Sequence, residues 1–320
     1  MTLTRLATRT LIAAALVGGL AFATDRRASQ REAAAEAAYP PIGQIIIVMG
    51  KRVHAHVEGQ GPDLILIHGA SGNLRDFTFD LSAQLAKHYR VIAFDRPGLG
   101  WSDDLGARGI SPMAHAEVLQ AATRVLGVKR PIVLGHSYGG SVAMAWALSD
   151  PTTAGLVLVS GATMPWPGDL GTWYQITSSR IGGATAVPLI AAFAPEDRAE
   201  KAVQGIFAPD PVPEGYVRYV GAGLTLRRDT LRANARQVSA LKEFILQMEP
   251  RYAGLTLPVE IIHGTADTIV PAKVHAIPLS RILPNATLTL IEGGGHMPHH
   301  VHADLVIAAI DRVAEKAGLR

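Results

Sequence analysis

Residues 131–148, PIVLGHSYGGSVAMAWAL, constrain the fold more than any other stretch of the chain. Ile132–Leu134 is a short apolar run that predicts a buried strand, and the Ala-rich sequence after Gly140 predicts a helix. Between them lies the pattern G-x-S-x-G, in which a sharp turn lifts the serine hydroxyl and flanking glycines let strand and helix pass closely. The stretch therefore predicts an exposed nucleophile, Ser137, if other segments supply a base and an acid.

Apolar runs and helical segments alternate on both sides of this stretch, which predicts an α/β fold: a mostly parallel central sheet with helices on both faces. The hairpin 44–57 turns at Gly50-Lys51, and one helix is expected over 76–88, another from Ser111-Pro112 to Gly127, and a last one from Asp304. The buried strands are expected at Asp63–Ile67, Arg90–Phe94, Gly155–Ser160, Pro258–Ile262 and Thr287–Ile291.

Three polar segments directly follow predicted strand ends, at Ala70, Asp95 and Ser137. Ligands on such sheets bind beyond the carboxyl ends of the strands, so these segments are expected to meet at one edge. The turn-rich loop after Asp95 is expected to shape that edge rather than to react. On the hairpin, His54 and His56 share one face, which we expect to be solvated rather than to bind a metal.

The α/β alternation stops between residues 162 and 251, which predicts a helical cap inserted into a core of residues 41–161 and 252–320. One long amphipathic helix is expected over 227–247. An insert that leaves from a strand end covers the site edge, so it acts as a lid that shapes the pocket. The residues expected to line this pocket are His68, Trp166, Trp173 and Tyr174.

The first 40 residues predict a signal peptide or a membrane anchor followed by a linker. Leu11–Ala23 is an unbroken apolar run that ends in Ala-Phe-Ala, a typical cleavage site, and its length suits a signal peptide. Residues 6–24 could instead span a membrane as an uncleaved anchor. Both alternatives imply an exported or membrane-attached protein, periplasmic or held at the inner membrane. A buried core helix is a third, weaker alternative.

A serine nucleophile needs a neutral imidazole to take its proton, and the imidazole needs a carboxylate to orient it. Asp267 and His296 each lie in a loop just after a late predicted strand, in the chain order Ser, Asp, His. His68 and His136 are rival bases, and Glu292 and Asp304 are rival acids. The cluster His299, His300 and His302 is expected to begin the last helix or to face solvent rather than to bind a metal.

These motifs together resemble the α/β-hydrolase superfamily, in its capped branch with a serine nucleophile, which includes esterases, lipases and C–C hydrolases. The matching pieces are His68-Gly69, Asp95-Arg96-Pro97-Gly98-Leu99-Gly100-Trp101-Ser102, the elbow Gly135–Gly139, the Asp267 loop and His296. The resemblance implies a catalytic triad of Ser137, Asp267 and His296. It also implies an oxyanion hole made by the backbone N–H groups of Ala70 and Tyr138. Dehalogenases and most epoxide hydrolases have aspartate where this chain has Ser137, so those activities are disfavoured.

We therefore expect a hydrolase of small-molecule carboxylic esters that works through an acyl-enzyme, without cofactor or metal. The alternatives are a C–C hydrolase, with Arg180, Arg227 and Arg228 as candidate carboxylate anchors, and a non-catalytic, membrane-attached ligand-binding protein. The chain has no basic run interleaved with aromatics, so nucleic acid is not an expected partner. It has no cysteine, which excludes disulfides and thiolate metal sites.

Overall fold

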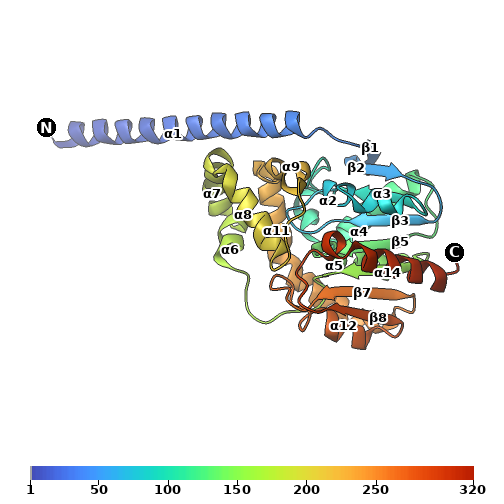
Figure 1. The fold of residues 1–320 in the computed structure, drawn as a ribbon. Coiled ribbons are helices and arrows are strands. Elements are labelled where there is room, and N and C mark those ends of the chain that lie inside the picture. Colours follow the sequence, from blue (N-terminus) through green and yellow to red (C-terminus); the bar gives the residue numbers. More distant parts are fainter. Residues whose placement is uncertain (1) are drawn as a thin grey trace.

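An eight-stranded sheet runs through the centre of the molecule, seen in the computed structural model, which describes residues 2–320 (Figure 1). Its spatial order is β1-β2-β4-β3-β5-β6-β7-β8. The strands are β1 Gln44–Val48, β2 Lys51–Glu58, β3 Asp63–Ile67, β4 Arg90–Phe94, β5 Ile132–His136, β6 Gly155–Val159, β7 Val259–Gly264 and β8 Ala286–Ile291.

The sheet is antiparallel only at one edge. β1 pairs with β2 and β2 with β4 in antiparallel fashion, while every pair from β4 across to β8 is parallel. The central strands β3, β5 and β6 are almost wholly buried, as their continuous apolar runs require. The α/β fold class and the mostly parallel sheet predicted from the sequence are thus confirmed.

Helices cover both faces of the sheet. One face packs against α4 Pro112–Val125, α5 Tyr138–Ser149 and α12 Ala276–Ile282, and the other against α2 Arg75–Thr78, α3 Leu81–Leu85 and α14 Ala303–Lys316. Two further short helices are η1 Gly106–Ile110 and α13 Pro298–Val301. The single helix expected over 76–88 is wrong: the chain breaks at Asp80, whose φ of −154° is not helical, so two short helices form. Ser111 caps α4 by accepting from the Ala114 amide, as expected.

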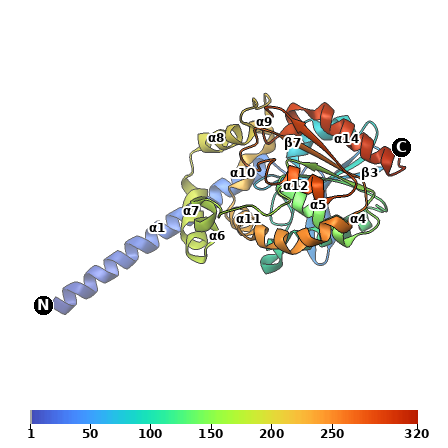
Figure 2. The ribbon, with the colours of Figure 1, turned by 90° about the horizontal axis from the view of Figure 1, so that it is seen from below.

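The segment between β6 and β7 forms a helical layer beyond the carboxyl ends of the strands (Figures 1 and 2). Its long helix packs on the sheet side through Leu241 and Ile245. The elements are α6 Thr172–Ser178, α7 Arg180–Phe193, α8 Glu196–Phe207, α9 Tyr216–Val220, α10 Ala222–Thr225, α11 Arg228–Met248 and η2 Glu249–Gly254.

The N-terminal segment is one helix, α1 Thr2–Ala38, that projects from the body (Figures 1 and 2). Residues 7–23 are exposed, whereas Ala28 is fully buried against Ala191 and Ala192 of α7. The second half of α1, expected as a linker, is therefore a helix packed against the cap. The helix is long and apolar enough to cross a membrane, a property it shares with signal sequences.

Candidate active site

Ser137 lies at a sharp turn between β5 and α5. Its φ of 53° and ψ of −119° are strained for a residue with a side chain, and such strain gathers at functional sites. Glycine is required on both sides of the turn: a Cβ on Gly135 would lie 2.2 Å from the Gly139 carbonyl oxygen, and one on Gly139 would lie 2.1 Å from that of Ile67. The geometry is that of a nucleophile elbow.

His296 follows β8 and is oriented by Asp267, which follows β7. The His296 Nδ1 lies 2.7 Å from Asp267 Oδ2, and both residues are buried. Asp267 Oδ1 accepts from the amides of Ile269 and Val270, each at 2.9 Å. Burial opposes ionisation of Asp267, yet the hydrogen bonds from His263 and His296 hold its pKa well below the usual value. An ionised Asp267 fixes the proton of His296 on Nδ1 and leaves Nε2 free to accept.

Ser137 and His296 both line a cavity of about 410 Å³ between the core and the cap. Most of its wall is apolar, with side chains from α6, α8 and α11. The described residues that line it include no lysine and no arginine. A cavity of this size and character suits a small or medium-sized, largely apolar ligand.

The loop after β3 meets the elbow from the other side of the cavity. A Cβ on Gly69 would lie 2.9 Å from the Ser137 Cβ, so the peptide that leads to Ala70 passes directly beside the serine. Tyr138 is the first residue of α5, where backbone N–H groups have no helical partner. The backbone N–H groups of Ala70 and Tyr138 thus both belong to segments next to Ser137.

Arg96 holds this loop in place from beneath. Its fully buried guanidinium donates to the carbonyl oxygens of His68 and Gly69 at 2.9 Å, and to Gln237 Oε1 at 2.8 Å. It also stacks 4.2 Å from the centre of the Tyr138 ring. Burial lowers the pKa of Arg96 to about 10, a value that keeps it cationic at neutral pH.

His68 does not line the cavity, which corrects the prediction from the sequence. It is fully buried, accepts from the Arg96 amide at 3.0 Å and lies with Nδ1 2.9 Å from the Gly69 carbonyl oxygen. Burial, together with the charge of Arg96, lowers its pKa to about 4. His68 is therefore a neutral residue that supports the loop.

Of the aromatic residues predicted to line the pocket, Trp173 and Tyr174 do so and Trp166 does not. Trp166 packs partly buried against the core, with its ring 6.0 Å from that of His275. The segment 162–171 runs outside the cavity before α6 begins, and for this reason the first tryptophan of the cap is too early in the chain to reach the site.

Asp76 forms a buried hub that the sequence did not reveal. Its Oδ1 accepts from the Tyr216 hydroxyl at 2.7 Å and lies 2.8 Å from His300 Nε2, and its Oδ2 lies 3.1 Å from His299 Nε2. Burial opposes the charge, but the two histidines hold the pKa of Asp76 well below its usual value. The expectation that these histidines begin the last helix or face solvent is therefore wrong for His299 and His300. His302 does precede α14 directly, at its N-cap position, although its side chain makes no capping bond.

His136 connects this hub to the segment that carries His296. Its Nε2 lies 3.0 Å from the His296 carbonyl oxygen and therefore donates to it, while its Nδ1 lies 3.9 Å from Asp76 Oδ2. Burial lowers the pKa of His136 well below the usual value, so this ring is neutral and its Nδ1 is a bare acceptor. Among the residues that the structure describes, Nδ1 has no hydrogen-bond partner.

Asp76, His136 and His299 are also the one group within residues 2–320 whose metal-binding atoms lie close together, all within 4.8 Å. His299 Nε2 bonds Asp76, and its Nδ1, like that of His136, has no hydrogen-bond partner among the described residues.

Two cap residues hold the loops of the site, and no pattern in the sequence singles them out. Asn234 of α11 accepts from the Ser71 amide at 2.7 Å and donates to the Ser71 hydroxyl at 3.0 Å. Asp210, after α8, accepts from the Gly295 amide at 2.7 Å, next to His296. The cap therefore contacts the backbone on both sides of the cavity.

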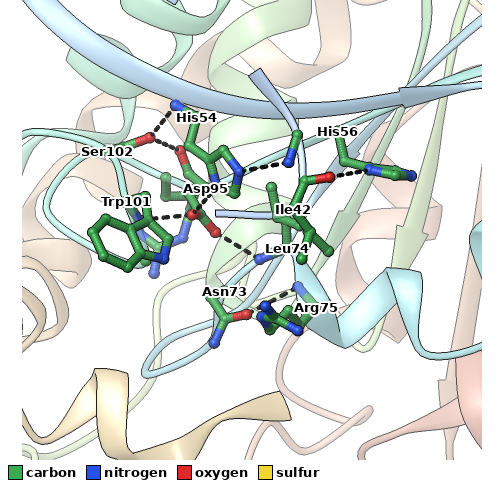
Figure 3. Close-up of polar contacts among 12 residues, drawn as sticks. Ile42, His54, His56, Asn73, Leu74, Arg75, Asp95, Trp101 and Ser102 are labelled. Carbon is green, nitrogen blue, oxygen red and sulfur yellow. Dashed lines mark hydrogen bonds and ion pairs between the residues drawn. The ribbon is translucent and has the colours of Figure 1, made fainter. Parts of the chain in front are cut away.

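The loop after β4 is structural, as expected, and Figure 3 shows how it is held. Asp95 Oδ1 accepts from the Leu74 amide and Oδ2 from the Trp101 amide, both at 2.7 Å, and Oδ2 lies 2.6 Å from His54 Nδ1. His54 is thus buried against Asp95, and the solvated face predicted for it is wrong; His56, partly buried, donates to the Ile42 carbonyl oxygen. The sequence could not reveal this pairing because β2 and β4 become neighbours only in the folded sheet.

Comparison with known proteins agrees with this fold. A sequence model described as "Alpha/beta hydrolase family" matches residues 64–309. The chain is 29% identical to a 2-hydroxy-6-oxononadienedioate/2-hydroxy-6-oxononatrienedioate hydrolase of Paraburkholderia phymatum, over 79% of this chain and 87% of that protein. Among solved structures, the esterase RhEst1 from Rhodococcus superposes with a TM-score of 0.67 at 23% identity, covering 86% of this chain and 98% of that one. A membrane phospholipase A, described as a bacterial virulence factor, superposes with a TM-score of 0.67 at 20% identity, covering 96% of this chain and 98% of that one.

Proposed function

Because this chain belongs to the alpha/beta hydrolase family, we propose that it is a serine hydrolase that cleaves carboxylic esters through an acyl-enzyme. The observation that carries the proposal is the shared cavity of Ser137 and His296, with His296 bonded to Asp267 at 2.7 Å. The strained elbow at Ser137 and the free Nε2 of His296 supply what a serine nucleophile needs.

In the proposed reaction, Ser137 Oγ attacks the ester carbonyl carbon while His296 Nε2 takes the hydroxyl proton. The backbone N–H groups of Ala70 and Tyr138 donate to the oxyanion. His296 then gives its proton to the leaving alkoxide, and the alcohol departs. Water attacks the acyl-enzyme, His296 takes a proton from it, and the acid is released with that proton returned to Ser137.

C–C bond hydrolysis by the same triad is the second candidate, since a relative with 29% identity has that activity in its name. That relative's substrate is a dioate, which would favour cationic side chains in the pocket. The candidate anchors do not line the cavity: Arg227 and Arg228 pair with Glu36 and Glu32 of α1, and Arg180 is exposed. We therefore favour an uncharged ester.

The test is hydrolysis of p-nitrophenyl esters of increasing chain length by the pure protein and by Ser137→Ala. We expect the variant to lose hydrolysis and labelling by a fluorophosphonate probe while it keeps its fold. Near-full esterase activity in Ser137→Ala would refute the mechanism. Absence of labelling in the natural protein would favour the third alternative, a non-catalytic ligand-binding protein.

We further propose that α1 attaches the protein to a membrane and is not removed. The possible cleavage site at Ala23 lies within one continuous helix, and Thr24, just after it, is buried against the body. Proteases prefer exposed, extended segments, so a helix that continues into a packed face is a poor substrate. Mass spectrometry of the protein from the membrane fraction tests this: the intact N-terminal segment is expected, and a chain that starts at Thr24 would contradict it.

A further inference from the structure

We propose that the outer face of α6 and α7 lies on the membrane surface beside α1, and that esters dissolved in the bilayer enter the cavity across this face. This inference rests on the proposed function, because it assumes that α1 is in the membrane and that Ser137 cleaves esters. It adds a docking surface and a substrate class to both.

α1 is held firmly against the cap. Arg228 of α11 donates to both carboxylate oxygens of Glu32 at 2.8 Å, and Arg227 pairs with Glu36 at 3.0 Å. From the α1 side, Arg27 donates to the Ala192 carbonyl oxygen at 2.8 Å and Arg31 to that of Ala194 at 2.8 Å. These carbonyls end α7, where arginine side chains commonly cap a helix. The direction of α1 is therefore fixed relative to α7.

Large apolar side chains are exposed on both sides of this junction. Residues 11–22 of α1 expose Leu11, Leu16, Val17, Leu20 and Phe22 at 62–70% of their full area. In both views α6 and α7 lie at the side of the body from which this half of α1 projects (Figures 1 and 2). They expose large apolar side chains of their own: Trp173 47%, Ile176 47%, Ile181 79%, Leu189 48% and Phe193 49%. Large exposed apolar side chains on two consecutive helices beside an apolar helix favour an interaction surface.

The bend and the length of α6 and α7 favour a position on the membrane surface over a position across the membrane. α6 and α7 together are apolar enough for a membrane segment, but they are bent by 104° at their junction. The 14 residues of α7 extend about 21 Å, which is less than the roughly 30 Å of the hydrocarbon core. The pair therefore fits the interface, with exposed Arg180 at the bend and exposed Arg26 on α1 available to lipid phosphates.

Trp173 connects the outer face of α6 and α7 to the cavity that contains Ser137. Trp173 is half exposed on the outer face and also lines the cavity that contains Ser137. Thr177 of α6 and Val203 of α8 line the same cavity. An acyl chain could pass from the bilayer along Trp173 to the serine without crossing water. The expected substrates are acyl esters that partition into the membrane, rather than freely soluble esters.

Tryptophan fluorescence tests the docking without any turnover. The full chain is reconstituted into vesicles of phosphatidylcholine with either plain or brominated acyl chains. In the natural protein, we expect brominated lipid to quench most of the emission of Trp173, which is the emission that Trp173→Phe lacks. The variant keeps Trp101, Trp146 and Trp166, and we expect brominated lipid to quench little of their emission. Equal emission from both vesicles in the natural protein would overturn the proposal, and this is also the result expected if the face binds a second copy instead.

Kinetics then test the substrate route. In Ile181→Gln/Leu189→Gln, loss of apolar contact with lipid is expected to lower hydrolysis of a long-chain p-nitrophenyl ester in vesicles about tenfold. Hydrolysis of soluble p-nitrophenyl acetate should not change. The control Val125→Gln/Ile47→Gln replaces two exposed apolar residues outside α1 and the cap and should leave both rates unchanged. An unchanged vesicle rate in the first variant would refute the route, whereas quenching of Trp173 without hydrolysis of any ester would refute the proposed esterase and not the docking.

Discussion

The Tyr216 hydroxyl donates to Asp76 Oδ1 at 2.7 Å, and this bond joins α9 of the cap to α2 of the core. The same carboxylate accepts from His299 and His300 of α13, the short helix that follows His296. One buried charge thus ties together the cap, the core and the loop of the proposed catalytic base. A change at this hub should affect both the stability of the cap and the position of His296.

Tyr216→Phe is expected to lower the free energy of unfolding by about 1.5–3 kcal/mol, because it removes a hydrogen bond to a charged acceptor. The matched control is Tyr219→Phe on the same helix, whose hydroxyl donates at 3.0 Å to the neutral Thr78 carbonyl oxygen and should cost about 1 kcal/mol. Urea unfolding of both variants measures the difference. Equal losses would mean that the charge of Asp76 adds nothing to the bond.

Arg96→Lys should lower kcat by up to about 10²- to 10³-fold, the range seen when an oxyanion donor is lost. A single ammonium cannot reproduce the planar fork that reaches both His68 and Gly69 carbonyl oxygens. The Ala70 amide would then drift from the oxyanion position, so KM should change much less than kcat. Steady-state kinetics measure kcat and KM separately. The control is Arg236→Lys, because Arg236 forms its ion pair with Asp104 away from this loop. A change in KM alone would argue against this role for Arg96.

Asp267→Asn tests the choice of acid. The neutral amide would favour the wrong tautomer of His296, and kcat should fall by about 10⁴-fold. Glu292→Gln, the exposed rival acid that follows the same strand as His296, should retain kcat. Circular dichroism shows whether both variants are folded. If Glu292→Gln were the inactive variant, the assignment of Asp267 would be wrong.

The sequence was most informative where chemistry depends on local geometry. The glycines around Ser137 predicted the elbow, because only a residue without a Cβ fits next to the Gly139 or Ile67 carbonyl oxygen. The continuous apolar runs predicted the parallel strands for a similar reason, since each strand must be buried on both faces. These features can be read from a few neighbouring residues.

The sequence was least informative where partners are far apart in the chain. Asp76 and His300 are separated by 224 residues, and Asn234 meets Ser71 across 163, so no local pattern announces either pair. A histidine also gives no sign of its own burial: His54 and His68 are next to apolar residues in strands, and only the fold shows that each bonds a buried partner. The docked half of α1 escaped prediction for the same reason, because its acidic residues find their arginines on α11.

The neutral, buried His68 should make stability depend on pH. Its pKa falls from 6.5 to about 4 in the folded protein, so between these values the unfolded chain binds the proton more tightly. The contribution is fully present above pH 6.5 and is lost as the pH falls toward 4; between pH 7 and pH 5 it amounts to about 2 kcal/mol. Urea unfolding at both values should therefore show a smaller loss on acidification in His68→Gln than in the natural protein. His88→Gln, at an exposed position, should keep the natural dependence. If His68→Gln lost as much stability on acidification as the natural protein, His68 would have to be protonated in the folded state. That would contradict the hydrogen bond that His68 accepts from the Arg96 amide.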